Sequence, residues 1–139
     1  MIFLDTGFYF AILFAKDENH NRAQELLLEI TEKKYGAIFT SDFVLDESMT
    51  LVNSRTKGMR KVLLGKMTSL FIGPQPIANL IMIQKSMLNN IIKIQLKYTE
   101  PSRVISFTDA SNIFLCQKFR IENIISFDDH YNGILSNIR

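Results

Sequence analysis

The chain opens with a short apolar run, Ile2-Phe3-Leu4, that leads directly into Asp5, Thr6 and Gly7. Consecutive apolar residues bounded by polar ones predict a buried β-strand here. A carboxylate directly after such a strand lies at the carboxyl edge of a sheet, which is the edge at which open α/β sheets bind their ligands. Asp5 is therefore the first candidate functional residue.

Helices and short strands alternate along the rest of the chain, and this alternation predicts a parallel sheet with helices on its faces. The expected helices are Thr6–Ala15, His20–Lys34, Asp42–Arg55, Met59–Leu70, Ile77–Tyr98 and Ser106–Phe119. The expected strands after the first are Ala37–Thr40, Phe71–Ile72 and Ile124–Ser126. The tail, Ile134–Arg139, fits either a short edge strand or a fraying end.

Composition narrows the class of protein. A length of 139 residues predicts a single domain, 1–139, and 47% hydrophobic with 22% charged residues excludes a disordered chain. No apolar stretch approaches the ~20 residues that cross a bilayer. The single cysteine excludes an internal disulfide and a cysteine-based zinc site. Because Asp5 interrupts the first apolar run, no secretory signal is expected, and the predicted location is the cytoplasm.

Three further acidic residues, Glu47, Asp109 and Asp128, occupy similar positions near junctions of the predicted elements. Carboxylates held a few ångströms apart repel one another, so a cluster of them needs a neutralising charge. Mg²⁺ and Mn²⁺ prefer such oxygen ligands and keep several bound waters. A bound metal lowers the pKa of water and stabilises charge on phosphoryl oxygens. Convergence of the four carboxylates would therefore create a site for phosphodiester hydrolysis.

The four acidic positions lie in short motifs that are common individually but specific in combination. The motifs are Ile2-Phe3-Leu4-Asp5-Thr6, Val44-Leu45-Asp46-Glu47, Phe107-Thr108-Asp109-Ala110 and Ile125-Ser126-Phe127-Asp128. In this order the chain resembles the PIN domain, and most of all the single-domain ribonucleases of the VapC-type toxin group. His20-Asn21-x-Ala23 also fits the pattern of that group, and the resemblance extends from Asp5 to about Tyr131.

The resemblance implies an α/β fold, a three-layer α/β/α sandwich around a central, mostly parallel sheet. It implies that the metal ligands and catalytic residues, for Mg²⁺ or Mn²⁺, are Asp5, Glu47, Asp109 and Asp128. Thr6 and Ser126 are expected to support them through hydrogen bonds to a carboxylate or a water. The implied partners are an RNA substrate, a cognate antitoxin protein and a second copy of the chain in a homodimer.

Each acidic residue also has a structural explanation. Asp5 can cap the first helix, and Asp109 can pair with Ser106 in a capping box. Ser126-x-x-Asp129 allows a second capping box. Glu47, taken alone, is typical of a solvated helix position.

Two of the assignments have a competing neighbour. Asp46 precedes Glu47, and helical geometry alone excludes neither from a cleft. Asp129 follows Asp128 in the same way. The family pattern favours Glu47 and Asp128 in both cases.

Five basic residues fall within twelve positions that contain no acidic residue: Arg55, Lys57, Arg60, Lys61 and Lys66. A surface of this kind suits phosphate contacts, and a solvated helix face explains it equally well. If the carboxylates converge, these side chains are expected to hold RNA across the cleft or to meet an acidic partner.

The remaining reactive side chains are expected to be structural. His20 fits a loop or cap residue, His130 a surface loop, and Cys116 core packing on the helix that Asp109 opens. The aromatic residues near the start of the chain fit a core or a dimer surface before they fit platforms for bases, and they are Phe8, Phe10 and Phe14.

The leading prediction is a metal-dependent endoribonuclease that acts as the toxin of a type II toxin–antitoxin pair. A PIN-like RNA-binding or scaffold module with little catalysis is the alternative, favoured by the net charge of only +2 and the weak strand signal after Tyr131. A third prediction keeps the chemistry but assigns it to RNA processing rather than to a toxin.

Overall fold

The computed structural model describes residues 1–139, and a five-stranded, all-parallel sheet lies at its centre. The strands are β1 (Ile2–Leu4), β2 (Ile38–Ser41), β3 (Asn79–Ile81), β4 (Asn123–Ile125) and β5 (Ser136–Ile138). Their order across the sheet is β3-β2-β1-β4-β5. All three residues of β1 are fully buried, which is why this central strand reads as a continuous apolar run.

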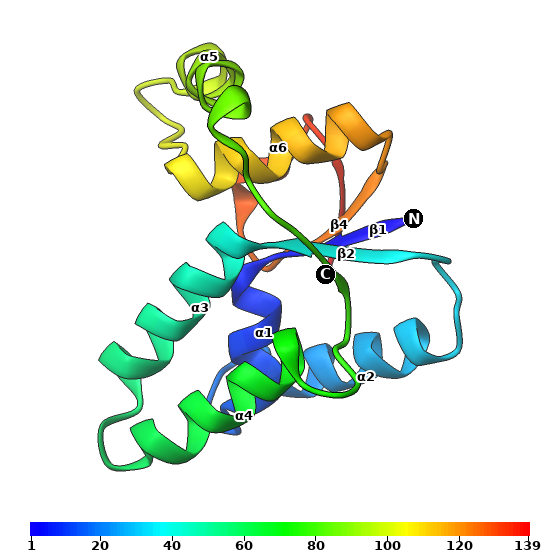
Figure 1. Ribbon diagram of the computed structural model, residues 1–139, viewed down its shortest axis with the longest axis vertical. Coiled ribbons are helices and arrows are strands. Elements are labelled where there is room, and N and C mark those ends of the chain that lie inside the picture. Colours follow the sequence, from blue (N-terminus) through cyan, green and yellow to red (C-terminus); the bar gives the residue numbers. More distant parts are fainter.

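Helices cover both faces of the sheet. They are α1 (Thr6–Leu13), α2 (His20–Thr31), α3 (Asp42–Arg55), α4 (Arg60–Ile72), α5 (Leu88–Tyr98) and α6 (Phe107–Phe119). Figure 1 shows α1 to α4 gathered on one face and α5 and α6 on the other. The predicted three-layer α/β/α sandwich is therefore confirmed. None of the helices combines the length and apolar composition needed to cross a bilayer.

Helix α1 forms the centre of the core on its face of the sheet. Its aromatic residues Phe8, Tyr9 and Phe10 are buried, and the Tyr9 ring stacks on Phe71 of α4 with centroids 4.0 Å apart. The predicted core role of Phe8 and Phe10 is confirmed. Cys116 of α6 is also buried in the core, as expected, and its burial raises the pKa of the thiol to about 12. The cysteine is therefore structural rather than reactive.

Two predicted elements are wrong. Phe71–Ile72 is the last turn of α4 and not a strand, because Leu63, Met67 and Phe71 bury one face at helical spacing. Ile77–Tyr98 is not one helix: its start supplies β3, which pairs with β2, and α5 begins only at Leu88. Pairing with a neighbouring strand outweighs the local helical preference in this segment.

The tail of the chain forms a strand. Ser136–Ile138 pairs in parallel with β4 and becomes an edge of the sheet, so the edge-strand alternative is correct. The weak strand signal after Tyr131 no longer favours the binding-module alternative. His20, as expected, is a structural residue at the start of α2, where its Nδ1 lies 2.6 Å from the carbonyl oxygen of Ala11.

Helix α6 ends at a strained residue that offers a test of the fold. Arg120 adopts a left-handed conformation with φ of 56°, which a side chain with a Cβ disfavours. Arg120→Gly is therefore expected to raise the free energy of unfolding by up to about 1 kcal/mol. Urea denaturation measures the change. Gly133→Ala, at a φ of +76°, is the matched opposite and should destabilise the protein.

Candidate active site

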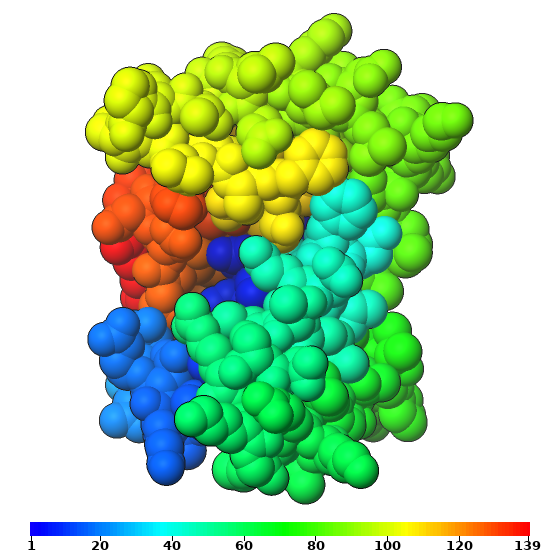
Figure 2. Space-filling view, turned by 90° about the vertical axis from the view of Figure 1, so that its left-hand side faces the viewer, coloured from blue at the N-terminus to red at the C-terminus, as the bar shows by residue number.

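A cleft of about 530 Å³ opens at the carboxyl ends of the central strands. The order of the strands reverses at this point, because β2 and β3 are added on one side of β1 and β4 and β5 on the other. Such a switch point is the usual ligand site of an open α/β sheet. Figure 2 shows the hollow, with dark blue atoms from the start of the chain at its floor and other segments around the rim. The carboxylates Asp5, Glu47, Asp109 and Asp128 all line it.

Asp5 lies at the floor of the cleft and is 6% exposed. Ser126 Oγ donates a hydrogen bond of 2.7 Å to its Oδ2, and Asn112 Nδ2 donates one of 3.0 Å to its Oδ1. The side chain makes no capping hydrogen bond to α1, so the capping explanation is wrong for Asp5. Its pKa is raised to about 7, above all by burial and further by the negative charge of Asp109, although the bond from Ser126 acts in the opposite direction.

Glu47 reaches the cleft from α3. Thr6 Oγ1 donates a hydrogen bond of 2.6 Å to its Oε2, so the predicted support by Thr6 is present in the structure. Desolvation raises the pKa of Glu47, and the nearby carboxylates add to the effect. Asp46 lies about 100° away around the helix axis, is exposed and does not line the cleft. The structure therefore places Glu47, and not Asp46, with the other carboxylates.

Asp109 has two roles at the start of α6. It forms the expected capping box, because its backbone N–H donates to Ser106 Oγ at 3.0 Å and its Oδ2 accepts from the Ser106 N–H at 2.8 Å. It also lines the cleft, where Tyr131 Oη donates a hydrogen bond of 2.9 Å to its Oδ1. The capping and cleft explanations are therefore compatible, since one carboxylate serves both.

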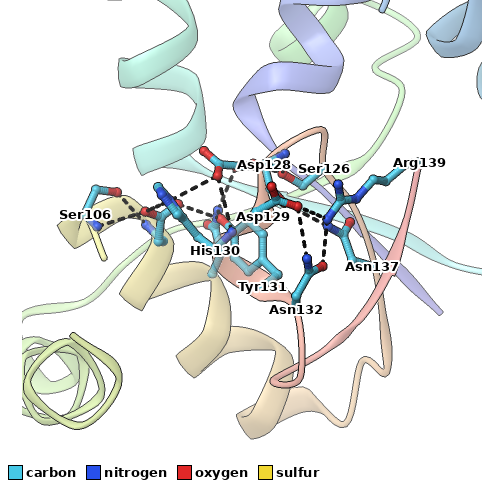
Figure 3. Close-up of polar contacts among 12 residues, drawn as sticks. Ser106, Ser126, Asp128, Asp129, His130, Tyr131, Asn132, Asn137 and Arg139 are labelled. Carbon is cyan, nitrogen blue, oxygen red and sulfur yellow. Dashed lines mark hydrogen bonds and ion pairs between the residues drawn. The ribbon is translucent and has the colours of Figure 1, made fainter. Parts of the chain in front are cut away.

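Asp128 and Asp129 both line the cleft but differ in their partners. Asp129 pairs with Arg139, which lowers the pKa of this carboxyl group, and it also accepts from Asn132. The Asp128 backbone N–H donates to Ser126 Oγ at 3.1 Å, so the capping box that the sequence allows between Ser126 and Asp129 does not form. Figure 3 shows the Asp129 carboxylate turned toward Arg139 and away from the Asp128 side chain. Arg139 thus pairs with Asp129 and leaves the Asp128 carboxylate without an arginine or lysine partner.

His130 was expected in a surface loop, and the structure corrects this. Its Nδ1 lies 3.2 Å from Asp109 Oδ2 and 3.3 Å from Asp128 Oδ1, between the two carboxylates (Figure 3). The loop turns inward because Asp128 accepts the His130 backbone N–H and starts a short 3-10 turn, Asp129–Tyr131. The sequence carries a weak signal for this placement, since His130 directly follows two acidic residues.

Of the five basic residues, only Arg55 lines the cleft. It shares one face of α3 with Glu47 and Leu51, and its guanidinium carbon lies 6.0 Å from the ring centroid of Phe10. The other four are exposed on the following turn and on α4, away from the cleft: Lys57, Arg60, Lys61 and Lys66. The structure therefore divides the basic run into one cleft residue and four surface residues.

The chemistry of the cleft fits a divalent cation. Its donors are carboxylate oxygens, and no lysine or arginine forms an ion pair with Asp5, Glu47 or Asp109. Burial above all, and repulsion from the neighbouring carboxylates in addition, raise the pKa of Asp5 and Glu47, as expected where a positive charge is needed. In this conformation no three acidic, histidine or cysteine side chains converge closely enough to ligate one ion directly. Mg²⁺, however, keeps several waters and needs only one or two direct carboxylate ligands.

Comparisons with known proteins agree with this geometry. A VapC ribonuclease from Archaeoglobus fulgidus is 23% identical over 129 residues, which cover 93% of this chain and 78% of that protein. The crystal structure of VapC20 from Mycobacterium tuberculosis, a Sarcin-Ricin loop cleaving toxin, superposes with a TM-score of 0.79 at 23% identity and covers 98% of both chains. The PIN domain model matches residues 2–134. The chain therefore belongs to the PIN domain family.

Proposed function

We propose that this protein is a Mg²⁺- or Mn²⁺-dependent endoribonuclease and the toxin of a toxin–antitoxin pair. The observation that carries the proposal is the meeting of Asp5, Glu47, Asp109 and Asp128 in one cleft, although they come from four separate parts of the chain. The similarity to a VapC ribonuclease and to a toxin that cleaves the Sarcin-Ricin loop supports RNA as the substrate.

In this proposal the four carboxylates hold the metal, directly or through its waters. When bound, the metal would lower the pKa of a water molecule and neutralise charge on the phosphoryl oxygens. The protein supplies orientation, because Ser126 fixes Asp5 and Thr6 fixes Glu47 through short hydrogen bonds. No serine, cysteine or threonine nucleophile is required, and Thr6 and Ser126 are occupied as donors to carboxylates.

The direct test is RNA cleavage with and without metal. Cleavage of a structured RNA is expected with Mn²⁺, should stop in EDTA and should return when Mn²⁺ is added again. Glu47→Gln should reduce the rate about 100-fold, because it removes one charge that faces the metal. Asp46→Asn is the matched control, since it removes one charge from the adjacent, exposed residue. Equal loss in both variants would contradict the assignment of Glu47.

Arg55 is the residue proposed to contact the RNA backbone within the cleft. The Phe10 ring beneath its guanidinium limits the motion of a side chain whose donors suit phosphate oxygens. Arg55→Ala should raise the KM for RNA about tenfold, the effect of losing one charged hydrogen bond. Lys61→Ala, on the exposed face of α4, should change the KM far less. Similar KM values for both variants would show instead that the whole basic run acts diffusely.

A cognate antitoxin and a homodimer complete the proposal. Large apolar side chains remain exposed on α4 and α5, among them Val62, Ile72 and Leu96, and they provide surfaces for such partners. A toxin is expected to arrest growth when it is produced without its antitoxin, and Asp5→Asn should abolish the arrest. Normal growth together with RNA cleavage in vitro would favour the RNA-processing alternative.

A further inference from the structure

Two buried polar side chains connect Asp5 to Asp109 beneath the floor of the cleft. Asn112 Nδ2 donates a hydrogen bond of 3.0 Å to Asp5 Oδ1 and another of 3.0 Å to Tyr131 Oη. Tyr131 Oη in turn donates one of 2.9 Å to Asp109 Oδ1. Asn112 and Tyr131 are both 0% exposed. An uninterrupted chain of hydrogen bonds therefore joins two carboxylates that stand 104 positions apart in the sequence, at 5 and 109.

The two linking residues come from different elements. Asn112 lies one helical turn after Asp109 on α6, so that both side chains emerge on the same face. Tyr131 ends the 3-10 turn that begins after Asp128. Figure 3 shows Tyr131 within the network of polar contacts below His130. The link thus ties the start of α6 to the loop after β4 as well as to β1.

This arrangement is costly for a core. The Oδ1 atom of Asn112 is buried without a hydrogen-bond partner, and the raised pKa of Tyr131, caused first by burial, keeps its hydroxyl protonated. Apolar side chains of similar volume at these two positions would avoid such a penalty. Stability alone therefore does not explain Asn112 and Tyr131, whereas a role in holding the carboxylates does.

The remaining oxygens of the two carboxylates are held as well. Asp5 Oδ2 accepts from Ser126, and Asp109 Oδ2 accepts from the Ser106 N–H. With Oδ1 of each bound through the link, neither carboxylate is free to rotate. We propose that Asn112 and Tyr131 are positioning residues that fix the separation and orientation of Asp5 and Asp109 and thereby increase the affinity of the cleft for a divalent cation. The inference rests on the proposed function, because it assumes that these carboxylates bind metal.

The test measures Mn²⁺ binding to the whole protein by isothermal titration calorimetry, without RNA. Tyr131→Phe removes only the linking hydroxyl and is expected to raise the Kd for Mn²⁺ by about 10- to 100-fold, the usual effect of losing a partner that orients a metal ligand. Tyr9→Phe is the matched control. Tyr9 is also 0% exposed, but it does not line the cleft, and its hydroxyl makes no hydrogen bond to a cleft carboxylate. Its Kd should equal that of the wild type.

A second variant removes the link from its other end. Asn112→Ala should raise the Kd for Mn²⁺ in the same way. If circular dichroism shows that Tyr131→Phe does not fold, Asn112→Ala is used in its place. Asn112→Ala and Tyr131→Phe break the same connection. The Kd for Mn²⁺ of the double variant should therefore be no higher than the larger of the two single-variant Kd values. A purely structural role would lower the melting temperature and leave the Kd for Mn²⁺ unchanged.

The outcomes separate this inference from the proposed function. If the wild type binds Mn²⁺ and Tyr131→Phe binds it with the same Kd, the positioning role is wrong while the proposed function stands. If the wild type takes up no Mn²⁺, both are wrong. A selective rise of the Kd in Tyr131→Phe and Asn112→Ala, with Tyr9→Phe unchanged, supports the positioning role.

Discussion

Replacement of Asp5 by asparagine is expected to reduce the rate of RNA cleavage at least about 100-fold. The reason is that a weakly held metal no longer stabilises the charge on the phosphoryl oxygens in the transition state. Asparagine keeps the shape of the side chain and an oxygen, but it lacks the charge. Asp5 lies at the floor of the cleft, is 6% exposed and is held by Ser126, so a cation bound in the cleft would be neutralised by a carboxylate of fixed position. Single-turnover cleavage with excess enzyme measures the loss without a contribution from product release.

Asp17→Asn is the matched control for this prediction. Asp17 also lines the cleft, from the loop between α1 and α2, and the substitution removes the same unit of charge. Its Oδ1 accepts a local hydrogen bond from the Asn19 N–H, and it shares no hydrogen-bond partner with Asp5. Cleavage by Asp17→Asn should remain close to that of the wild type. An equal fall in both variants would mean that the total charge of the cleft, and not Asp5 itself, determines the rate.

The second large effect concerns the stability of the metal-free protein. The pKa of Asp5 is about 7 in the folded state and near 3.8 in the unfolded chain, chiefly because of burial. The folded state therefore binds the proton more tightly than the unfolded chain. The resulting contribution to the free energy of unfolding is fully present below about pH 4 and is lost as the pH rises through about 7. At pH 8 the ionised Asp5 should lower the free energy of unfolding by up to about 4 kcal/mol relative to pH 4.

Comparison with Asp5→Asn isolates this contribution. In EDTA, the difference in unfolding free energy between Asp5→Asn and the wild type should grow in favour of the variant as the pH rises from 5 to 8. Urea denaturation at each pH gives this difference, and the other titrating groups largely cancel. A difference that stays constant over this range would contradict the raised pKa. Addition of Mn²⁺ at pH 8 should stabilise the wild type and restore part of the lost free energy.

Local patterns in the sequence were enough to predict most of the architecture. The buried run of β1, the helical spacing in α2 and the Ser106 start of α6 each report the environment of their own residues. The error at Phe71–Ile72 concerned where α4 ends, whereas the error at Ile77–Tyr98 occurred where a pairing partner decides the structure. Residues 79–81 become a strand because β2 offers an edge, and nothing inside this segment encodes the presence of β2.

The site could be predicted in part. The resemblance selected Glu47 over Asp46, and the structure places Glu47 in the cleft, because one step along a helix turns a side chain to another face. The inward turn of His130 and the link through Asn112 were missed. Both depend on distances between segments far apart in the sequence. A polar asparagine on the largely buried helix α6 was the available signal for Asn112.

The central position of β1 has a consequence for how such a protein is made. The strand pairs with β2 and also with β4, which is more than 100 residues away. During synthesis, Ser126, which donates a hydrogen bond to Asp5, and the neighbouring Asp128 are made more than 100 residues after Asp5. A partly synthesised chain that lacks β4 contains Asp5, Glu47 and Asp109, but it lacks Ser126 and Asp128 and the central pairing of β1 with β4, so the cleft cannot form. A protein proposed to cut RNA acquires that capacity only after β4 and the turn that follows it have been synthesised.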